Sequence, residues 1–126
     1  MDNASVKMLI VDDSSTMRRI LKMTLGRCGY TDVSEASDGQ DALNQCQSGS
    51  FDCILTDWNM PNMDGLQFIQ NVRKLPAYAK TPIIMVTTEG AKDDVIEALT
   101  SGASAYIVKP FTPDTLQEKM KEVWPS

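Results

Sequence analysis

Three carboxylates, a hydroxyl and an ammonium group come directly after, or within two residues of, short apolar runs of the sequence. Crowded carboxylates repel one another unless a cation lies among them, and hard oxygen ligands favour Mg²⁺ over zinc or copper. A metal ion, an ammonium and a hydroxyl around a carboxylate form a receptor for a phosphoryl group, and a carboxylate can be the nucleophile that gives an acyl phosphate. The residues are Asp12 and Asp13 after the run 8–11, Asp57 after 53–55, Thr87 after 83–86 and Lys109 after 105–108.

Each of these residues also has an ordinary explanation when it is taken singly. Asp12 and Asp13 can be helix caps, and Asp57 can be a turn residue before a loop that contains proline. Thr87 can be a strand-end threonine, and Lys109 a solvated surface lysine. Independent caps and surface residues are not expected to gather at one edge of a sheet together with a counter-charge, so the combination favours a site.

The four runs consist of apolar residues without alternation, which is typical of strands buried on both faces of a parallel sheet. A weaker run at 33–36 completes five strands, and helical patterns lie between them. Five such units predict a three-layer α/β domain with right-handed crossovers, and ligands of such folds bind beyond the carboxyl ends of the strands. The expected apolar helix faces are Met17, Ile20, Leu21, Leu25 and Cys28; Ala42, Leu43 and Cys46; Leu66, Ile69 and Val72; Val95, Ile96 and Leu99; and Leu116, Met120, Val123 and Trp124.

Composition narrows the function classes. The chain has 126 residues, enough for one domain, and its 12 Lys+Arg against 17 Asp+Glu give a net charge of −5, which disfavours non-specific nucleic-acid binding. No apolar run approaches the roughly 18 residues of a membrane span, and the N-terminal sequence does not have the pattern of a signal peptide. We therefore expect neither membrane insertion nor nucleic-acid binding.

The absence of histidine removes several chemistries. The chain contains no histidine, so Ser-His-Asp and Cys-His catalysis and His-containing zinc sites are excluded, as is a role as a histidine phosphodonor. The three cysteines, Cys28, Cys46 and Cys53, are odd in number and form no CxxC motif. Free thiols in a reducing, cytoplasmic compartment are the expectation.

Five motifs together resemble a response-regulator receiver domain, and the resemblance runs from about residue 6 to residue 124. It is closest to the single-domain regulators of chemotaxis. The resemblance implies a flavodoxin-like (βα)5 three-layer sandwich with a five-stranded parallel sheet in the order 2-1-3-4-5, and one receiver domain over residues 1–126 with no output domain. The motifs are VDDSSTMRR (11–19), DWNMPNMDG (57–65), VTTE (86–89), GASAY (102–106) and VKPF (108–111).

The resemblance also implies roles for individual residues at the site. Asp57 would accept a phosphoryl group from the phosphohistidine of a sensor histidine kinase. Asp13, Asp57 and the backbone carbonyl of Asn59 would bind Mg²⁺ directly, and Asp12 would help through a water. Lys109 would pair with the acids and then with the phosphoryl oxygens. The peptide bond between Lys109 and Pro110 would be cis, a minority state for X–Pro bonds.

Further implied roles concern switching and reversal. Thr87 would hydrogen-bond the phosphoryl group, and Tyr106 would then turn inward. Asn59 and Glu89 would flank the path of the attacking water and tune self-dephosphorylation. The chain would therefore not be an enzyme beyond its own phosphoryl acceptance and autodephosphorylation.

Added charge at the strand ends is expected to repack the face made by the fourth helix, the fifth strand and the fifth helix. An apolar centre with a basic rim suits an acidic amphipathic peptide, although the same residues can form an ordinary solvated surface. Matching residues of chemotaxis regulators contact the flagellar motor switch protein, so the implied partners are that protein, a chemotaxis-type sensor kinase and a phosphatase, with the chain itself a monomer. The residues are Lys92, Val95, Leu99, Ala103, Tyr106, Val108 and Lys119.

Two departures from the resemblance and three alternatives remain open. Ser14 replaces a bulky apolar residue, and Thr88 stands where alanine is common, next to the switching threonine. The domain could instead be a phosphate sink or a phosphorelay shuttle outside motility. A flavin-binding module on the same fold is disfavoured because Asp12 and Asp13, beside the loop that would bind the flavin phosphate, would repel it. An aspartate-nucleophile phosphatase is also disfavoured. Such enzymes carry a second acid two residues after the nucleophile, and at that position this chain has Asn59, an amide that cannot act as a general acid or base.

Overall fold

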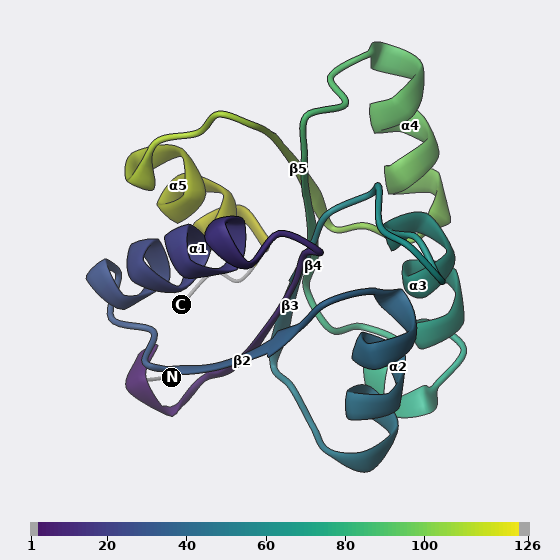
Figure 1. Ribbon diagram of the computed structural model, residues 1–126, viewed down its shortest axis with the longest axis horizontal. Coiled ribbons are helices and arrows are strands. Elements are labelled where there is room, and N and C mark those ends of the chain that lie inside the picture. Colours follow the sequence, from purple (N-terminus) through teal and green to yellow (C-terminus); the bar gives the residue numbers. More distant parts are fainter. Residues whose placement is uncertain (1–2, 124–126) are drawn as a thin grey trace.

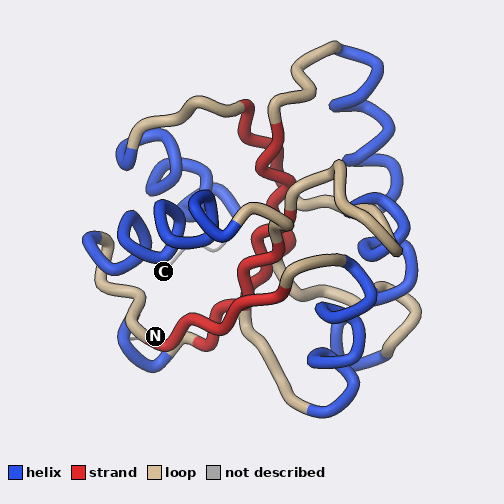
Figure 2. The backbone as a smooth tube through the Cα atoms, viewed as in Figure 1, coloured by secondary structure: helices blue, strands red, loops and turns tan. Residues whose placement is uncertain are grey.

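A computed structural model describes residues 3–123, and its centre is a single sheet of five parallel strands. The strands are β1 (Lys7–Val11), β2 (Asp32–Ala36), β3 (Cys53–Thr56), β4 (Ile83–Thr87) and β5 (Ala105–Val108). Their order is β2-β1-β3-β4-β5, as the resemblance implied. The first strand therefore lies inside the sheet, and the chain winds outward to both sides of it (Figure 2).

Helices cover both faces of this sheet. Figure 1 shows α1 (Ser15–Arg27) and α5 (Pro113–Val123) on one side. The other side carries α2 (Gly39–Ser48), α3 (Gly65–Val72) and α4 (Lys92–Ser101). Two short 3-10 helices, at Asn3–Ser5 and Pro76–Tyr78, complete the secondary structure of the described part. The three-layer α/β arrangement is confirmed.

The start of several helices follows from their capping residues. The Ser14 side chain accepts a hydrogen bond from the first turn of α1, and Asp38 does the same for α2. At α3, Asp64 and Gln67 form a reciprocal capping box, which satisfies two backbone donors that a helix start leaves free. Gly102 ends α4 with a φ of 122°, a conformation that glycine adopts without the steric cost of a Cβ.

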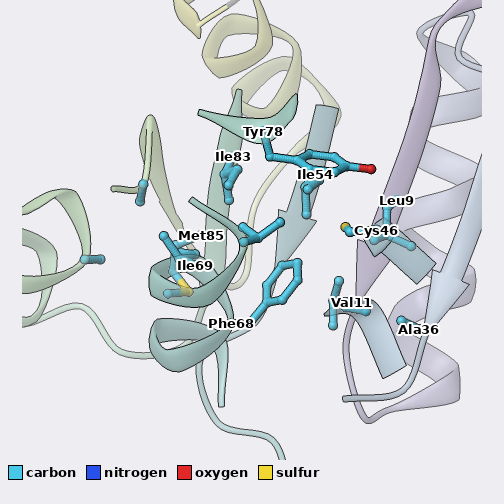
Figure 3. Packing of buried hydrophobic residues seen from close by; sticks show 14 of the residues in the cluster. Leu9, Val11, Ala36, Cys46, Ile54, Phe68, Ile69, Tyr78, Ile83 and Met85 are labelled. Atoms are coloured by element: carbon cyan, nitrogen blue, oxygen red, sulfur yellow. The ribbon is translucent and has the colours of Figure 1, made fainter. Parts of the chain in front are cut away.

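The core consists of two apolar layers, one on each side of the sheet. Met8 and Ile10 of β1 belong to the layer under α1 and α5, whereas Leu9 and Val11 belong to the layer under α2, α3 and α4. Figure 3 shows the second layer, where Phe68 of α3 points toward the strands. Because the central strands are covered on both sides, their sequences show no polar alternation.

Some of the expected helix faces are wrong. On α1 the buried residues are Leu21, Thr24 and Leu25, while Ile20 is 44% exposed. A residue advances about 100° around a helix, which places Ile20 at the edge of the face centred on Leu21. On α3 the fully buried Phe68 was missed.

The expected face of α4 is also wrong in part. Ile96 and Leu99 are 50% and 44% exposed, and the buried residue of this helix is Ala98. Val95 is partly buried against the core. The helix α4 therefore exposes two large apolar side chains to solvent, and packing within the domain does not explain this exposure. Trp124, expected on the last helix, lies outside the described residues.

Candidate functional site

The sheet register brings the ends of four strands together. Val11 of β1 pairs with Thr56 of β3, and the Asp57 backbone N–H donates to the Val11 carbonyl at 2.9 Å. On the other side of the sheet centre, Thr87 of β4 pairs with Val108 of β5. Asp12, Asp57 and Lys109 each follow these paired positions by one residue, so the strand ends place them at one edge, as the sequence predicted.

Lys109 lies between two of the acids. Its Nζ is 2.8 Å from Asp12 Oδ2 and 3.2 Å from Asp57 Oδ2. The side chain of Asp12 is 2% exposed, that of Lys109 10% and that of Asp57 14%. Lys109 is therefore no solvated surface lysine, because its ammonium lies almost buried between two carboxylates. The peptide bond from Lys109 to Pro110 is cis, as the resemblance implied.

Asp13 joins these acids in a group that fits a hard cation. Asp12, Asp13 and Asp57 each offer a carboxylate oxygen, and the three oxygens lie within 4.8 Å of one another. The group combines one buried, one partly buried and one exposed residue, so a ligand can reach it from solvent. Three carboxylates face one ammonium, and the excess negative charge and all-oxygen donor set suit a divalent ion such as Mg²⁺.

Backbone N–H groups hold the carboxylates in place. The Ser14 N–H donates to Asp12 Oδ1 at 2.9 Å, and the Trp58 N–H donates to Asp57 Oδ1 at 2.7 Å. Arg18 Nη1 donates to the Asp12 carbonyl at 2.7 Å. The cap of α1 is Ser14 and not Asp12 or Asp13, and the carboxylates of Asp12 and Asp57 belong to the cluster. Arg18 was not predicted to contribute to the site, because a cation one turn into a helix gives no signal of its own.

Thr87 and Tyr106 are buried residues on the neighbouring strands β4 and β5. Thr87 is fully buried, and the Glu89 N–H approaches its Oγ1 at 3.5 Å. Tyr106 is 9% exposed, and its hydroxyl donates to the Glu89 carbonyl. Burial, reinforced by the carboxylates of Asp94, Glu89 and Asp57, raises the pKa of Tyr106 to about 12. Tyr106 thus has the inward orientation that the resemblance implies for this residue.

Asn59 and Glu89, expected to flank the path of water, contact each other. Asn59 Nδ2 donates to Glu89 Oε1 at 2.9 Å, and both residues are exposed. They come from the loops after β3 and β4, so their hydrogen bond joins these two loops. Thr88 follows the last residue of β4 and is exposed, whereas Thr87 is buried.

The loop between β3 and α3 is held closely at its base. The Gly65 N–H donates to the Trp58 carbonyl at 2.7 Å. A Cβ on Gly65 would lie 1.9 Å from the Asp57 carbonyl oxygen, so only glycine fits there. Asn62, at the far end of the loop, has a φ of 67° and donates to Asp38 at 2.7 Å. The sequence analysis missed this Asp38–Asn62 contact.

The expected partner face is only partly a surface. Lys92, Leu99 and Val108 are exposed, and Val95 and Lys119 are partly so. Ala103 and Tyr106 are buried, so they contribute little to any contact in this state. Ile96, not included in the expected face, adds a second exposed apolar side chain to α4.

Cys28, Cys46 and Cys53 are free thiols, and burial raises the pKa of Cys53 to about 12. Among residues 3–123, no helix is long and apolar enough to cross a membrane.

A family model and several known proteins match most of this chain. The family model of the response regulator receiver domain matches residues 8–121. Chemotaxis protein CheY1 of Helicobacter pylori is 52% identical over 119 residues, which cover 94% of this chain and 96% of that protein. A CheY homolog of Campylobacter jejuni is also 52% identical over 119 residues, covering 94% of this chain and 92% of its own length.

Solved structures give the same result. Vibrio cholerae chemotaxis protein CheY4 has a TM-score of 0.87 and 42% identity, covering 94% of this chain and 98% of its own. The CheX-CheY-BeF3-Mg²⁺ complex of Borrelia burgdorferi contains a chain with a TM-score of 0.90 and 26% identity, covering 96% of this chain and 90% of its own.

Proposed function

This chain belongs to the response regulator receiver domain family, as a CheY-like receiver of chemotaxis signalling, and from that premise we propose that it takes a phosphoryl group onto Asp57 and transmits the signal by binding another protein. The observation that carries the proposal is Lys109 held between Asp12 and Asp57, beside a third carboxylate. One ammonium among three acids leaves negative charge that a bound cation would offset.

Mg²⁺ is the proposed cofactor. Asp12, Asp13, Asp57 and the backbone carbonyl of Asn59 would hold it, and when bound it would neutralise charge that develops on the transferred group. The Borrelia complex, which contains Mg²⁺ and BeF3, supports this choice. The all-oxygen donor set of the described cluster supports it independently.

The chain's own residues would then do the following. A carboxylate oxygen of Asp57 attacks the phosphorus of a phosphohistidine from a sensor histidine kinase; an O–P bond forms, the P–N bond breaks, and its electron pair stays on the imidazole nitrogen. The Lys109 ammonium and the Thr87 hydroxyl hydrogen-bond the transferred oxygens. Asn59 and Glu89 orient or exclude the water that later hydrolyses the acyl phosphate. The chain turns over no external substrate, so it would not be an enzyme in the ordinary sense.

The signal would leave through α4, β5 and α5. New charge on Asp57 draws Thr87 and Lys109 toward it, and both residues are continuous with β4 and β5. The exposed side chains of Ile96, Leu99 and Val108, with Lys92 and Lys119 nearby in the sequence, suit an acidic amphipathic peptide. The relatives are named as chemotaxis proteins, which supports a role in chemotaxis. Within that role, the partner that we propose is the flagellar motor switch protein, the regulator would be monomeric and cytoplasmic, and a phosphatase would reset it.

Intact-mass spectrometry after brief incubation with a small phosphodonor and Mg²⁺ tests the phosphoryl chemistry. We expect a gain of one phosphoryl group that requires Mg²⁺ and is absent from Asp57→Asn. No gain under conditions where calorimetry shows Mg²⁺ binding would refute phosphoryl acceptance.

Binding of an acidic motor-switch peptide tests the output. We expect tighter binding after phosphorylation, and weaker binding by Leu99→Ser with unchanged phosphorylation. Equal affinity in both states would instead favour a phosphate sink or relay shuttle.

A further inference from the structure

The loop that carries Asn59 is fastened at both ends, and its far end is attached to the start of α2. Residues 57–65 connect β3 to α3. At the base, the Gly65 N–H donates to the Trp58 carbonyl at 2.7 Å. At the far end, Asn62 and Met63 contact Asp38 and Gly39, which are more than 20 residues away in the sequence.

Asp38 has two partners, one for each carboxylate oxygen. Its Oδ1 accepts from the Asp41 N–H at 2.8 Å, which caps α2. Its Oδ2 accepts from Asn62 Nδ2 at 2.7 Å. The two hydrogen bonds join the N-terminus of α2 to the loop through a single side chain. They also lower the pKa of Asp38, the Asp41 contact most.

The backbone reinforces this attachment. The Gly39 N–H donates to the Met63 carbonyl at 2.9 Å. A Cβ on Gly39 would lie 2.4 Å from that same oxygen, so the absence of a side chain allows the approach. Asn62 and Met63 are thus both hydrogen-bonded to the start of α2, Asn62 through its side chain and Met63 through its backbone carbonyl.

Between the two fastened ends lie only Asn59, Met60 and Pro61. Asn59 is the residue whose carbonyl is proposed to bind Mg²⁺ and whose side chain pairs with Glu89 at 2.9 Å. A short segment with both ends fixed has little freedom. We propose that Asp38 and Asn62 are positioning residues, which set the Asn59 backbone relative to the carboxylate cluster. This inference rests on the proposed function.

Asn62 offers a clean variant for the test. Its φ of 67° is one that few residues adopt, and asparagine tolerates it better than most. Asn62→Gly keeps this conformation accessible and removes only the amide that reaches Asp38. Asp38→Ser keeps a good helix cap but is too short to reach Asn62 as well.

The experiment compares Asn62→Gly, Asp38→Ser and the double variant with the unchanged chain. Calorimetric titration with MgCl2 gives the dissociation constant, and intact mass gives the phosphorylation rate with a small phosphodonor. We expect the Mg²⁺ dissociation constant to rise roughly three- to tenfold in each single variant, the range for one lost side-chain hydrogen bond. The double variant should match the singles, because both remove the same contact.

A matched control is Asn44→Ala. Asn44 accepts a hydrogen bond from Gln40 at 3.0 Å on the exposed surface of α2 and makes no contact with the loop among the described interactions. Its Mg²⁺ dissociation constant should equal that of the unchanged chain. Amide hydrogen exchange at Gly39 should quicken in Asn62→Gly and not in the control.

Three outcomes would overturn the inference. If both single variants bind Mg²⁺ and accept phosphate as the unchanged chain does, the contact does not position the site, and the proposed function stands. If the single effects add in the double variant, the two residues act separately and not through one contact. If the unchanged chain itself neither binds Mg²⁺ nor gains a phosphoryl group, the proposed function fails, and the inference with it.

Discussion

At the edge of the sheet, one ammonium group faces a cluster of three carboxylates. Lys109 contacts Asp12 and Asp57 directly, whereas Asp13 has no ion pair among the described contacts. The cluster therefore carries a net negative charge in the absence of a cation, and close like charges cost free energy. Repulsion among these carboxylates destabilises the folded chain, and the same negative charge favours binding of a metal ion that could in turn hold a phosphoryl group.

Asp57→Asn should consequently stabilise the chain when Mg²⁺ is absent. The amide is close in size to the carboxylate and removes one negative charge, while Lys109 keeps its 2.8 Å contact with Asp12. We expect the melting temperature without Mg²⁺ to rise by about 2–8 °C, which corresponds to about 1 kcal/mol for a domain of this size. Added Mg²⁺ should raise the melting temperature of the unchanged chain and raise that of Asp57→Asn less.

Differential scanning calorimetry with and without MgCl2 checks this prediction. Glu118→Gln, an exposed position on α5, makes the same change in charge away from the strand ends and should leave the Mg²⁺ effect intact. A lower melting temperature for Asp57→Asn would mean that its ion pair with Lys109 outweighs the repulsion.

At the scale of elements, the strands were predicted well and the helix faces less well. A strand buried on both sides needs only apolar residues, so 8–11 and 83–86 could be identified without knowing their neighbours. A helix face depends on which neighbour covers it, and Ile20 and Ile96 turned out exposed because α1 and α4 bury other sides. Helical spacing alone does not distinguish these cases.

The site shows the same limit. The acids and the lysine could be predicted because each follows a recognisable strand. The contact between Asp38 and Asn62 could not, because it joins side chains 24 residues apart through loop geometry. The inward position of Tyr106 depends on a hydrogen bond to a loop carbonyl, which also has no sequence signal.

Arg73 joins α3 to the turn between α4 and β5, and its removal should destabilise the fold. Its Nε and Nη2 donate to the Gly102 carbonyl at 3.1 and 2.8 Å, and its Nη1 donates to the Tyr78 carbonyl at 2.7 Å. Arg73→Gln loses this three-point contact. We expect the free energy of unfolding, measured with urea, to fall by about 1–3 kcal/mol, as for hydrogen bonds to a charged group.

Lys74→Gln is the matched control for Arg73→Gln. Lys74 is the neighbouring positively charged residue and is exposed. Its replacement by glutamine changes the net charge by the same amount as Arg73→Gln. Its free energy of unfolding should change by no more than about 0.5 kcal/mol. Equal losses in the two variants would show that Arg73 acts through its charge and not through its contacts.

At the scale of the whole molecule, the carboxylate cluster and Lys109 lie at one edge of the sheet. Buried thiols and tyrosine hydroxyls lie elsewhere, within the two apolar layers of the core. The layers are separated by the sheet (Figure 1). Every residue of β3 and β4 in the sheet is buried. Cys53 belongs to one layer, and Cys46, Tyr78 and Tyr106 to the other. Burial is the main cause that raises their pKa values, to about 11 for Cys46 and about 12 for the other three. Both layers thus depend on these groups remaining neutral.

Stability should therefore be lost in alkali, beginning near pH 9. The ordinary pKa is 9.0 for these thiols and 10.0 for these hydroxyls, so the unfolded chain loses protons first as the pH rises. Because the folded state then binds more protons than the unfolded state, the free energy of unfolding falls with pH. The stability contributed by the neutral groups is fully present below pH 9 and declines up to about pH 12. Urea unfolding at a series of pH values measures this, and Tyr106→Phe should make the decline shallower above pH 10. A free energy of unfolding that stays level from pH 9 to pH 11 would show that these groups ionise as readily in the fold as outside it.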